Sequence, residues 1–320
     1  MGIFDVFKKN RKMDTAEIHV SKEQKEPEST DTAEAENDDA IEEKDMDRIL
    51  KWIREKTAAT AYRLTVNTDQ KPGLSDTKFG GVPYWNPEME YPRDSEGAPL
   101  ALLAQLNMKD FSGSPIFPKE GLLQFFTGCN DVYGLDFDRQ DSQSAFRVIY
   151  HSKVDEHVTA EAVLALGIAT SLSNGDGEED DFPFDGEFAV DVEETAVSIG
   201  PSDYRYEDYI RQAAEALGIH LPESAGVYDM LSEEQYHDET EKNTGHWVLG
   251  HPYFTQNDPR EYQHEMKYYD TLLFQMDSDY GNGKEYEILW GDCGAAGFFV
   301  NQGDLKKWDF SKVMYNWDCC

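Results

Sequence analysis

Hydrophobic residues recur with two different periods along the chain. Over 45–58, Ile49, Trp52 and Ile53 recur at the spacing of one helical face, which predicts an amphipathic helix. Over 62–66, apolar and polar residues alternate, as they do in a strand that is buried on one side only. The pattern therefore predicts that a helix is followed directly by a strand.

Short apolar runs bounded by Gly, Pro or polar residues predict that most later elements are strands. Strands are expected at 100–108, 121–126, 145–151, 271–277, 286–292, 297–302 and 312–318. Helix signals are fewer: a helical face over 206–218 that ends at Gly218, a capping-box pattern from Ser232 to Gln235, and the pair Asp258-Pro259. The predicted fold class is α+β and β-dominated, with a few peripheral helices.

The N-terminal part of the chain has a different composition. Residues 13–44 contain almost no large apolar side chain and cannot bury enough surface to offset chain entropy, so residues 1–44 are predicted to be a disordered acidic tail. Within residues 1–12, four apolar side chains precede four basic ones, which suits weak docking on an anionic membrane or in a partner's groove. A solvated, disordered end is the alternative. No apolar run is long enough to span a bilayer, so no stable membrane association is expected.

Charge restricts the possible partners. The chain has 64 Asp and Glu against 29 Lys and Arg, a net charge of −35. A field of this sign repels phosphate backbones, so nucleic acid is an unlikely partner class and a basic protein is a plausible one. The alternative is that the charge only keeps the protein in solution. The cysteines are sparse and form no CxxC pair (Cys129, Cys293, Cys319 and Cys320), which favours free thiols in a reducing cytoplasm.

A pattern occurs twice along the chain. Gly81-Val82-Pro83-Tyr84-Trp85 is matched by Gly250-His251-Pro252-Tyr253-Phe254. Each stretch is followed by a Leu-Leu-x-Gln run and then by Gly and Phe-Phe, in the same order and at similar spacing. We interpret this as an internal duplication that gives one pseudo-symmetric domain over 45–320, with halves at about 45–170 and 196–320 and an acidic connector at 171–195. Chance similarity between β-rich segments is the alternative.

The glutamines of the repeat, Gln105 and Gln275, need a physical reason because each lies in an apolar strand-like run. A buried amide without partners costs about 1–3 kcal/mol. Two roles are open. The glutamines meet near the pseudo-twofold axis and tie the halves together, or they line a shared cleft and bind a ligand.

At these residues the chain resembles the YwqG-like family of bacterial proteins. The similar stretches include "DTKFGGVPYW", "LALLAQLNMKDF", "GLLQFFTG", "GHPYFTQNDPR", "LLFQMDSD" and "WGDCGAAGFFV", and together they cover most of 45–320. Members usually have Ser-Lys before the Gly-Gly, where this chain has Asp76-Thr77-Lys78-Phe79. The resemblance implies a mixed, β-rich fold and no particular reaction.

No familiar catalytic motif is present, so the first hypothesis is a non-enzymatic binding or interaction module without a cofactor or metal, and one version of it is an immunity-like role. We expect the loops of the two halves to form a cleft that binds a ligand or partner through Tyr84, Trp85, Gln105, Asn107, Tyr253, Phe254, Gln256, Gln275, Asp277 and Asp292. The alternative is an enzyme that uses Asp292, His251 or Asp277 as acid or base in a cleft between the halves. Two weaker metal hypotheses are zinc at His246 and His251, and Ca²⁺ at the carboxylates of 173–187.

Overall fold

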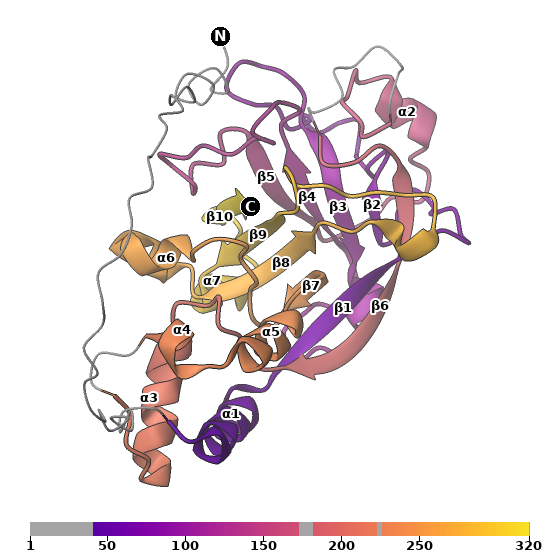
Figure 1. Cartoon of the computed structure of the whole chain (residues 1–320). Coiled ribbons are helices and arrows are strands. Elements are labelled where there is room, and N and C mark those ends of the chain that lie inside the picture. The colour runs from indigo at the N-terminus through magenta and orange to yellow at the C-terminus, as the bar shows by residue number, and fades with distance from the viewer. Residues whose placement is uncertain (1–40, 173–181, 223–225, 320) are drawn as a thin grey trace, which may run out of the picture. The chain divides into compact units, whose positions relative to one another are not determined.

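The computed structural model describes residues 41–172, 182–222 and 226–319 (Figure 1). Most of the tail predicted for residues 1–44, including the docking hypothesis for residues 1–12, lies outside the described residues. The first helix, α1, spans Glu43–Thr57 and so takes in the last two residues of that predicted tail.

The described chain is built around one ten-stranded sheet in which every pairing is antiparallel. Its strands in chain order are β1 (Ala59–Asn67), β2 (Lys78–Gly80), β3 (Ala101–Asn107), β4 (Leu122–Thr127), β5 (Phe146–His151), β6 (Glu187–Val197), β7 (His246–Leu249), β8 (Thr271–Asp277), β9 (Ala295–Val300) and β10 (Met314–Asp318). In space they follow the order β10-β9-β8-β7-β1-β6-β2-β3-β4-β5. The fold is therefore α+β and dominated by its sheet.

The order of the strands in the sheet is symmetric between strands β1–β5 and strands β6–β10. Exchanging β1 with β6, β2 with β7, β3 with β8, β4 with β9 and β5 with β10 reproduces the observed order in reverse. The first strand of each half pairs with the second strand of the other half, β1 with β7 and β6 with β2. The long β1–β6 pairing joins the halves at the centre of the sheet.

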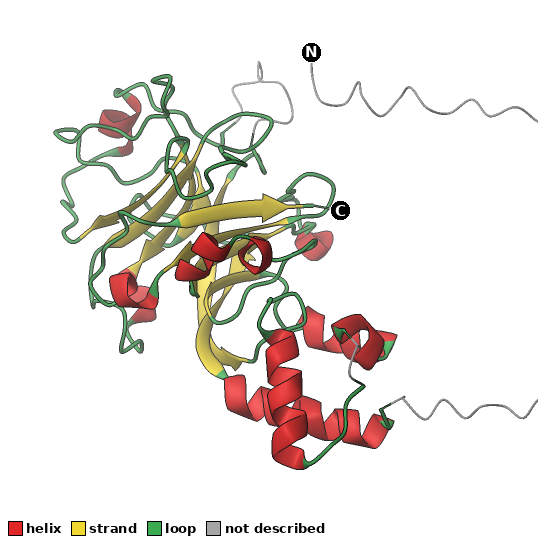
Figure 2. Ribbon diagram, turned by 90° about the vertical axis from the view of Figure 1, so that its left-hand side faces the viewer, coloured by secondary structure: helices red, strands yellow, loops and turns green. Residues whose placement is uncertain are grey.

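The sheet curls so that its two halves face each other across an aromatic core (Figures 1 and 2). Phe125 on β4 lies 4.7 Å from Phe274 on β8 and 5.0 Å from Phe298 on β9, between ring centroids. Phe125 and Phe298 occupy corresponding positions in the repeat, so phenylalanines meet where the glutamines were expected to meet. Buried aromatic pairs of this kind contribute about 0.5–1.5 kcal/mol beyond their buried area.

The outer strands β5 and β10 approach each other along a seam, where Phe146 and Tyr315 are 5.2 Å apart. The segment 140–143 lies between these two edges. The carbonyl of Gln140 accepts the outward N–H of Tyr315, and the side chain of Gln143 accepts the outward N–H of Val148 at 3.2 Å. These bonds occupy edge amides that would otherwise be available to a foreign strand.

The helices are short except for two. The remaining α-helices are α2 (Ala160–Leu164), α3 (Tyr206–Leu217), α4 (Val227–Met230), α5 (Glu233–Glu241), α6 (Pro259–Tyr262) and α7 (Gln302–Leu305), and the 3₁₀ turns are η2 (Met108–Phe111), η3 (His264–Tyr268) and η4 (Gly281–Gly283). The apolar faces of α1 and α3 share a second core with α4 and α5 to one side of the sheet (Figure 2). The apolar spacing in the sequence predicted both long helices, and the starts of α5 and α6 match their capping signals.

Two predicted segments differ in the structure. Residues 286–292 form a loop with one isolated bridge, Asp279 to Ile288, rather than a strand. Their apolar pattern arises because Ile288 and Trp290 are fully buried from that loop. The predicted connector 171–195 contains most of β6, because the alternation of Val190 and Val192 with acidic neighbours is that of a half-buried strand. The second half of the sheet therefore begins at Glu187.

Candidate functional site

Equivalent loops follow β2 and β7, and both begin with two residues in the left-handed region. Gly80 and Gly81 have φ of 66° and 71°, and Leu249 and Gly250 have φ of 63° and 82°. A glycine is needed at Gly250 because an added Cβ would lie 2.7 Å from the Val197 side chain. The repeated Gly-x-Pro-Tyr sequence therefore encodes a sharp turn out of a strand.

Gln105 holds the first of these loops. Its Oε1 accepts the Tyr84 N–H at 3.0 Å, and its Nε2 donates to the carbonyls of Leu74 and Asp76, both at 2.9 Å. Gln124 on β4 also donates to the same Oε1 at 2.7 Å. The amide thus clamps the loop before β2 to the loop after it.

Gln275 makes the corresponding bonds in the second half. Its Oε1 accepts the Tyr253 N–H at 2.8 Å, and its Nε2 donates to Asn243 and Gly245 carbonyls at 2.8 and 2.9 Å. Each glutamine therefore binds backbone groups of its own half. The hypothesis that the two side chains meet and tie the halves together is wrong, because the hydrogen-bonding atoms of each are already used locally.

The aromatic residues expected to form an open cleft are mostly part of the core. Tyr84, Trp85 and Phe254 are 3, 1 and 4% exposed. Trp85 packs edge-on against Tyr91 and Phe126, so its ring fills the interior below the loop. The structure places these rings in separate core clusters rather than around one shared pocket.

The polar members of the predicted cleft are also dispersed. Asn107 is half-buried and donates to the Ser75 carbonyl. Gln256 is exposed and bonds the carbonyl of Cys319, and Asp292 is exposed in the turn before β9. Tyr253 is half-buried, and Asp277 is buried at the end of β8. The structure therefore unites each glutamine with its own tyrosine loop and with a polar neighbour on the same strand, since Asn107 shares the 74–76 loop with Gln105 and Asp277 shares Gly245 with Gln275. Gln256 and Asp292 lie apart from both groups.

Two buried residues missed in the sequence extend the Gln105 network. The Gln124 side chain bonds the Tyr84 carbonyl at 2.7 Å and the His151 ring nitrogen at 2.8 Å. Burial lowers the pKa of His151 to about 4, so its ring is neutral near pH 7. Gln124 lies directly across from Gln105 in the β3–β4 ladder, a relation visible only once the strand register is known.

Asp277 is the buried acid of the second half. Its two oxygens accept the N–H groups of Gly245 and Ser278 at 2.7 and 2.8 Å, yet burial raises its pKa to about 6. Its own N–H donates to Nδ1 of His246 at 3.1 Å. That bond places the ring proton of His246 on Nε2, 3.5 Å from a carboxylate oxygen of Asp279.

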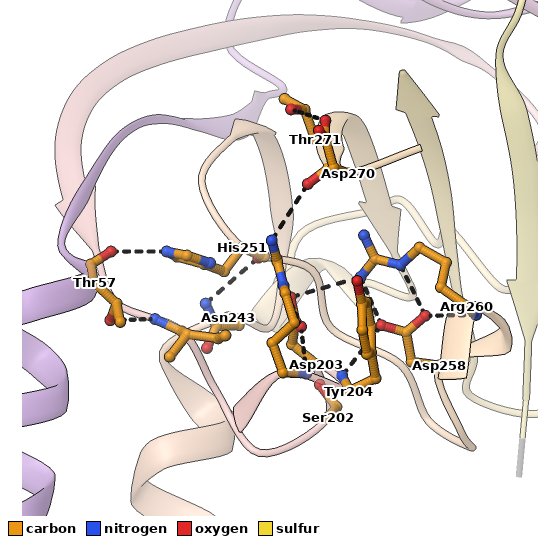
Figure 3. A network of polar contacts seen from close by, with 12 residues as sticks. Thr57, Ser202, Asp203, Tyr204, Asn243, His251, Asp258, Arg260, Asp270 and Thr271 are labelled. Carbon is orange, nitrogen blue, oxygen red and sulfur yellow. Dashed lines mark hydrogen bonds and ion pairs between the residues drawn. The ribbon is translucent and has the colours of Figure 1, made fainter. Parts of the chain in front are cut away.

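A second polar network joins α6 to the loop before α3 (Figure 3). Arg260 is fully buried and forms two bonds to the carboxylate of Asp258, at 2.9 and 2.6 Å. Its guanidinium also lies 3.6 Å from Asp203 and 4.6 Å from the centroid of the Phe299 ring. Burial opposes ionisation of Asp203, but Arg205 and Arg260 together lower its pKa to about 2. The two acids and two arginines balance one another, as buried charges must.

His251 lies at the edge of this network. Its Nε2 donates to the Thr57 carbonyl at 2.9 Å, which connects the second loop to the end of α1 (Figure 3). Burial lowers the pKa of His251, so the ring is neutral at physiological pH. Of the three residues proposed as acid or base, His251 and Asp277 are thus bonded to different backbone segments, and Asp292 lies in a surface turn.

The structure bears on the zinc hypothesis but on little of the Ca²⁺ hypothesis. Within residues 41–172, 182–222 and 226–319, no group of three or more His, Cys, Asp or Glu side chains is arranged to hold a metal ion, so His246 and His251 are not part of a three-ligand set. Most of the carboxylates considered for Ca²⁺, those at 173–181, lie outside the described residues.

An open groove of about 800 Å³ lies between the start of α1 and the turn from α4 into α5. Its apolar residues are Ile41, Met46 and Met230. Its polar residues are Glu43, Ser232, Glu233, Glu234, Gln235, His237 and Asp238, so that four carboxylates and no Lys or Arg line it among the residues that the structure describes. We call this feature the acid-rimmed groove.

The walls of the acid-rimmed groove are joined to each other. Gln235 on α5 donates to Asp47 on α1 at 3.1 Å, and Arg54 on α1 pairs with the buried Glu239 on α5. The capping box between Ser232 and Gln235 fixes the residue at which α5 begins. Glu233 and Glu234 therefore lie in the first turn of α5. The sequence signal was present as the run "LSEEQYHDE", but its capping pattern indicated only a helix start.

Comparisons with known proteins give a family but no annotated relative. Within the described residues, no helix has both the length and the apolar character that crossing a membrane requires. No curated protein matches the chain. The family model described as "Domain of unknown function (DUF1963)" matches residues 77–319, which is most of the sheet. The chain belongs to this DUF1963 family.

Proposed function

We propose that this protein is a non-enzymatic binding module that takes a basic, partly apolar segment of another protein into the acid-rimmed groove. The observation that carries the proposal is the composition of that groove, an apolar floor with four carboxylates around it. A partner segment with Leu or Met on one face and Lys or Arg on the other would fit both parts.

The net charge of −35 favours this choice of partner. A field of that sign attracts a basic chain over about a Debye length, which is about 8 Å at physiological salt, and speeds its association. Each exposed ion pair at the rim contributes about 1 kcal/mol or less, and Met46 and Met230 are buried, so the affinity would come from several rim pairs together with apolar contact at Ile41. An immunity-like role, in which the acidic protein neutralises a basic one, is the version we favour.

The alternative function, an enzyme, is favoured by one observation. Asp277 has a pKa of about 6 beside a histidine, which is what an acid–base catalyst requires. Asp277 lies at the end of β8, however, with both oxygens bonded to backbone N–H groups.

We also propose that the two halves arose by duplication of one β-rich module and that the protein is YwqG-like. The exchange-symmetric strand order and the matching bonds of Gln105 and Gln275 support duplication. The free thiols of Cys293 and Cys319 support a reducing, cytoplasmic location.

A titration tests the binding proposal. The probe is a fluorescein-labelled 14-residue peptide with Leu and Lys at helical spacing, and a peptide with Glu in place of Lys is its negative control. The protein is compared with the triple variant Glu233→Gln, Glu234→Gln, Asp238→Asn. A matched variant, Glu88→Gln, Glu90→Gln, Glu96→Gln, makes the same charge change on an exposed loop far along the chain.

We expect the groove variant to weaken binding of the Lys peptide by about ten-fold or more, since three rim pairs of up to about 1 kcal/mol each are lost. The matched variant should change affinity less than two-fold. Equal losses in the two variants would mean that only the overall charge attracts the peptide, and the groove would not be the site.

A further inference from the structure

A second open groove, which shares no residue with the acid-rimmed groove, lies along the edge of β5. It has a volume of about 530 Å³, and its other wall is the segment that precedes β10. We call it the seam groove, and its lining residues are Ser142, Gln143, Arg147, Val148, Ile149, Tyr150, Trp308, Phe310 and Ser311. The lining residues of β5 run without a break over 147–150 and so come from both faces of the strand. The groove therefore lies beside the strand, in the plane of the sheet, where a further strand would lie.

The edge of β5 turns unused backbone groups into the seam groove. β5 is the last strand at its end of the sheet, so every second residue turns its N–H and C=O away from β4. The Val148 N–H bonds the side chain of Gln143, which identifies Phe146, Val148 and Tyr150 as the outward residues. The Phe146 carbonyl accepts the side chain of Arg147. In the part of the chain that the structure describes, the Val148 carbonyl and both backbone groups of Tyr150 have no hydrogen-bond partner, so an extended peptide can add to them.

The side chain of Gln143 already occupies the first place in this row. Its Oε1 accepts the Val148 N–H at 3.2 Å, and its Nε2 donates to the Phe310 carbonyl at 2.8 Å. A peptide unit of a strand between β5 and 308–311 would make the same two bonds, with its C=O toward one neighbour and its N–H toward the other. Gln143 has a φ of 46°, a strained backbone conformation that persists only where the surrounding structure fixes it. The groove continues the line that the Gln143 carboxamide begins.

The side chains of the seam groove indicate what an added strand would carry. Arg147 and Ile149 lie on one face of β5, whereas Val148 and Tyr150 lie on the other face, where Tyr150 packs on Trp308. The side chains of an added strand alternate between the same two faces. One extended segment can therefore place a polar side chain beside Arg147 and apolar side chains beside Val148, without entering the contact between the two rings.

Arg147 gives its face of the groove a preference for an acidic side chain. It is the one charged residue of the lining, and no Asp or Glu of the described ranges lines the groove. Its guanidinium donates to the carbonyls of Phe146 at 2.8 Å and Arg93 at 3.4 Å and has no carboxylate partner among the described residues. Arg54 and Arg205, by contrast, both pair with acids. A guanidinium binds a carboxylate well, because its fork of N–H donors matches two oxygens.

We propose that the seam groove binds an extended segment of another protein as an added strand on β5, with an acidic side chain on Arg147 and apolar side chains on the face of Val148 and Tyr150. Main-chain hydrogen bonds to the edge of β5 supply affinity, and the alternate side chains supply specificity. The proposal does not depend on the basic segment proposed for the acid-rimmed groove, since the two grooves share no residue.

The test measures binding of three fluorescein-labelled heptapeptides to the full chain by fluorescence anisotropy. The first, Thr-Val-Glu-Val-Glu-Val-Thr, carries the proposed pattern, and the second has Gln in place of Glu. The third keeps Glu but has its three central amides N-methylated, which removes the backbone donors and leaves the side chains in place. We expect the Glu peptide to bind at least five-fold more tightly than the Gln peptide and at least ten-fold more tightly than the methylated one. The net charge of −35 opposes the preference for Glu, so overall charge does not produce it.

A variant locates the binding. In Arg147→Met, which keeps the apolar stem, the preference for Glu should disappear while the Gln peptide binds as before. Arg63→Met is the matched control, because it removes the same charge from β1, an interior strand with β6 and β7 on its two sides, and should leave the preference unchanged. Unfolding temperatures of both variants are measured in parallel. The comparison with the methylated peptide uses the unaltered protein and so does not depend on how Arg147→Met folds.

Five results would overturn the proposal. They are equal binding of the Glu and Gln peptides, a preference that survives in Arg147→Met, equal binding of the methylated peptide, and no binding of the Glu peptide at millimolar concentration. The fifth is a dimer in light scattering that dissociates in Arg147→Met, which would assign the edge of β5 to a second copy of the chain.

Discussion

Replacing Gln105 by Leu tests whether the repeated loops are held by a buried amide. Leucine has nearly the same size as glutamine, so the change leaves little cavity and removes mainly hydrogen bonds. Gln105 is fully buried, and its amide bonds the Tyr84 N–H, the carbonyls of Leu74 and Asp76, and the Gln124 side chain.

The magnitude follows from the groups left without a partner. The Tyr84 N–H is buried, and an unpaired buried donor costs about 1–3 kcal/mol. The two carbonyls lie in a partly buried loop and lose about 0.5–1.5 kcal/mol each. Gln124 keeps its hydrogen bond to the Tyr84 carbonyl, so the loss of its bond to Gln105 adds little to the loss of stability. Gln105→Leu should therefore lower the free energy of unfolding by about 2–6 kcal/mol, and Gln275→Leu by a similar amount.

The assay is urea denaturation followed by circular dichroism and tryptophan fluorescence, for both single variants and the double variant. Gln70→Leu is the matched control, since Gln70 is exposed in the turn after β1 and should change stability by less than about 0.5 kcal/mol. The double variant should show the sum of the single effects, because the networks of Gln105 and Gln275 share no residue.

Two results would refute this reasoning. Losses below about 1 kcal/mol would mean that the amides are not the clamps of their loops. A coupling energy above about 1 kcal/mol between the two glutamines would mean that they act on each other across the sheet, which the separate bonds of the structure exclude.

Two further predictions concern single residues of the second half. Gly250→Ala should destabilise by about 2–4 kcal/mol in the same denaturation assay, since the new Cβ meets Val197 and Ala61 at 2.7 and 2.9 Å. Gly97→Ala is the control, because Gly97 also has a positive φ, 91°, but open space around it, so its loss of stability measures the cost of the backbone conformation alone. Equal losses of stability in Gly97→Ala and Gly250→Ala would refute the steric argument. Asp277→Asn should raise stability at pH 7 by up to about 3 kcal/mol, because burial raises the carboxyl pKa from 3.8 to about 6 and the folded state resists ionisation. The wild type should lose this stability as pH rises from about 4 to 6, and the gain should vanish at pH 4; a gain that is equal at both pH values would contradict the assignment.

Much of the fold could be predicted from local patterns, since each pattern reflects burial of one face. The spacing of Ile49 and Ile53 in α1 and the alternation in β1 require only nearby residues, and both elements were predicted. The acidic residues of β6 concealed its alternation, and the two buried side chains of the loop at 286–292, Ile288 and Trp290, gave that loop the apolar pattern of a strand. Short strands such as β2 and β7 carry too few residues for a pattern, so they emerge only from their pairing.

The candidate site was harder to predict from the sequence, because it depends on contacts between segments that are distant along the chain. The repeat correctly singled out Gln105 and Gln275 as buried amides that need partners, but the identity of those partners follows from the loops around β2 and β7. Aromatic residues in the motif suggested a cleft, whereas Trp85 and Phe254 are core residues. The acid-rimmed groove combines elements far apart in the chain, α1 and α5.

Hydrogen exchange of the full chain, with and without a saturating amount of the Leu-Lys peptide, tests most directly whether the protein binds a basic partner at the acid-rimmed groove. Binding should slow exchange at residues 41–47 and 230–238, which form the groove walls, and leave the exposed acidic stretch 191–196 of β6 unchanged. Protection confined to β6, or spread over the whole acidic surface with none at the groove walls, would contradict the proposed site.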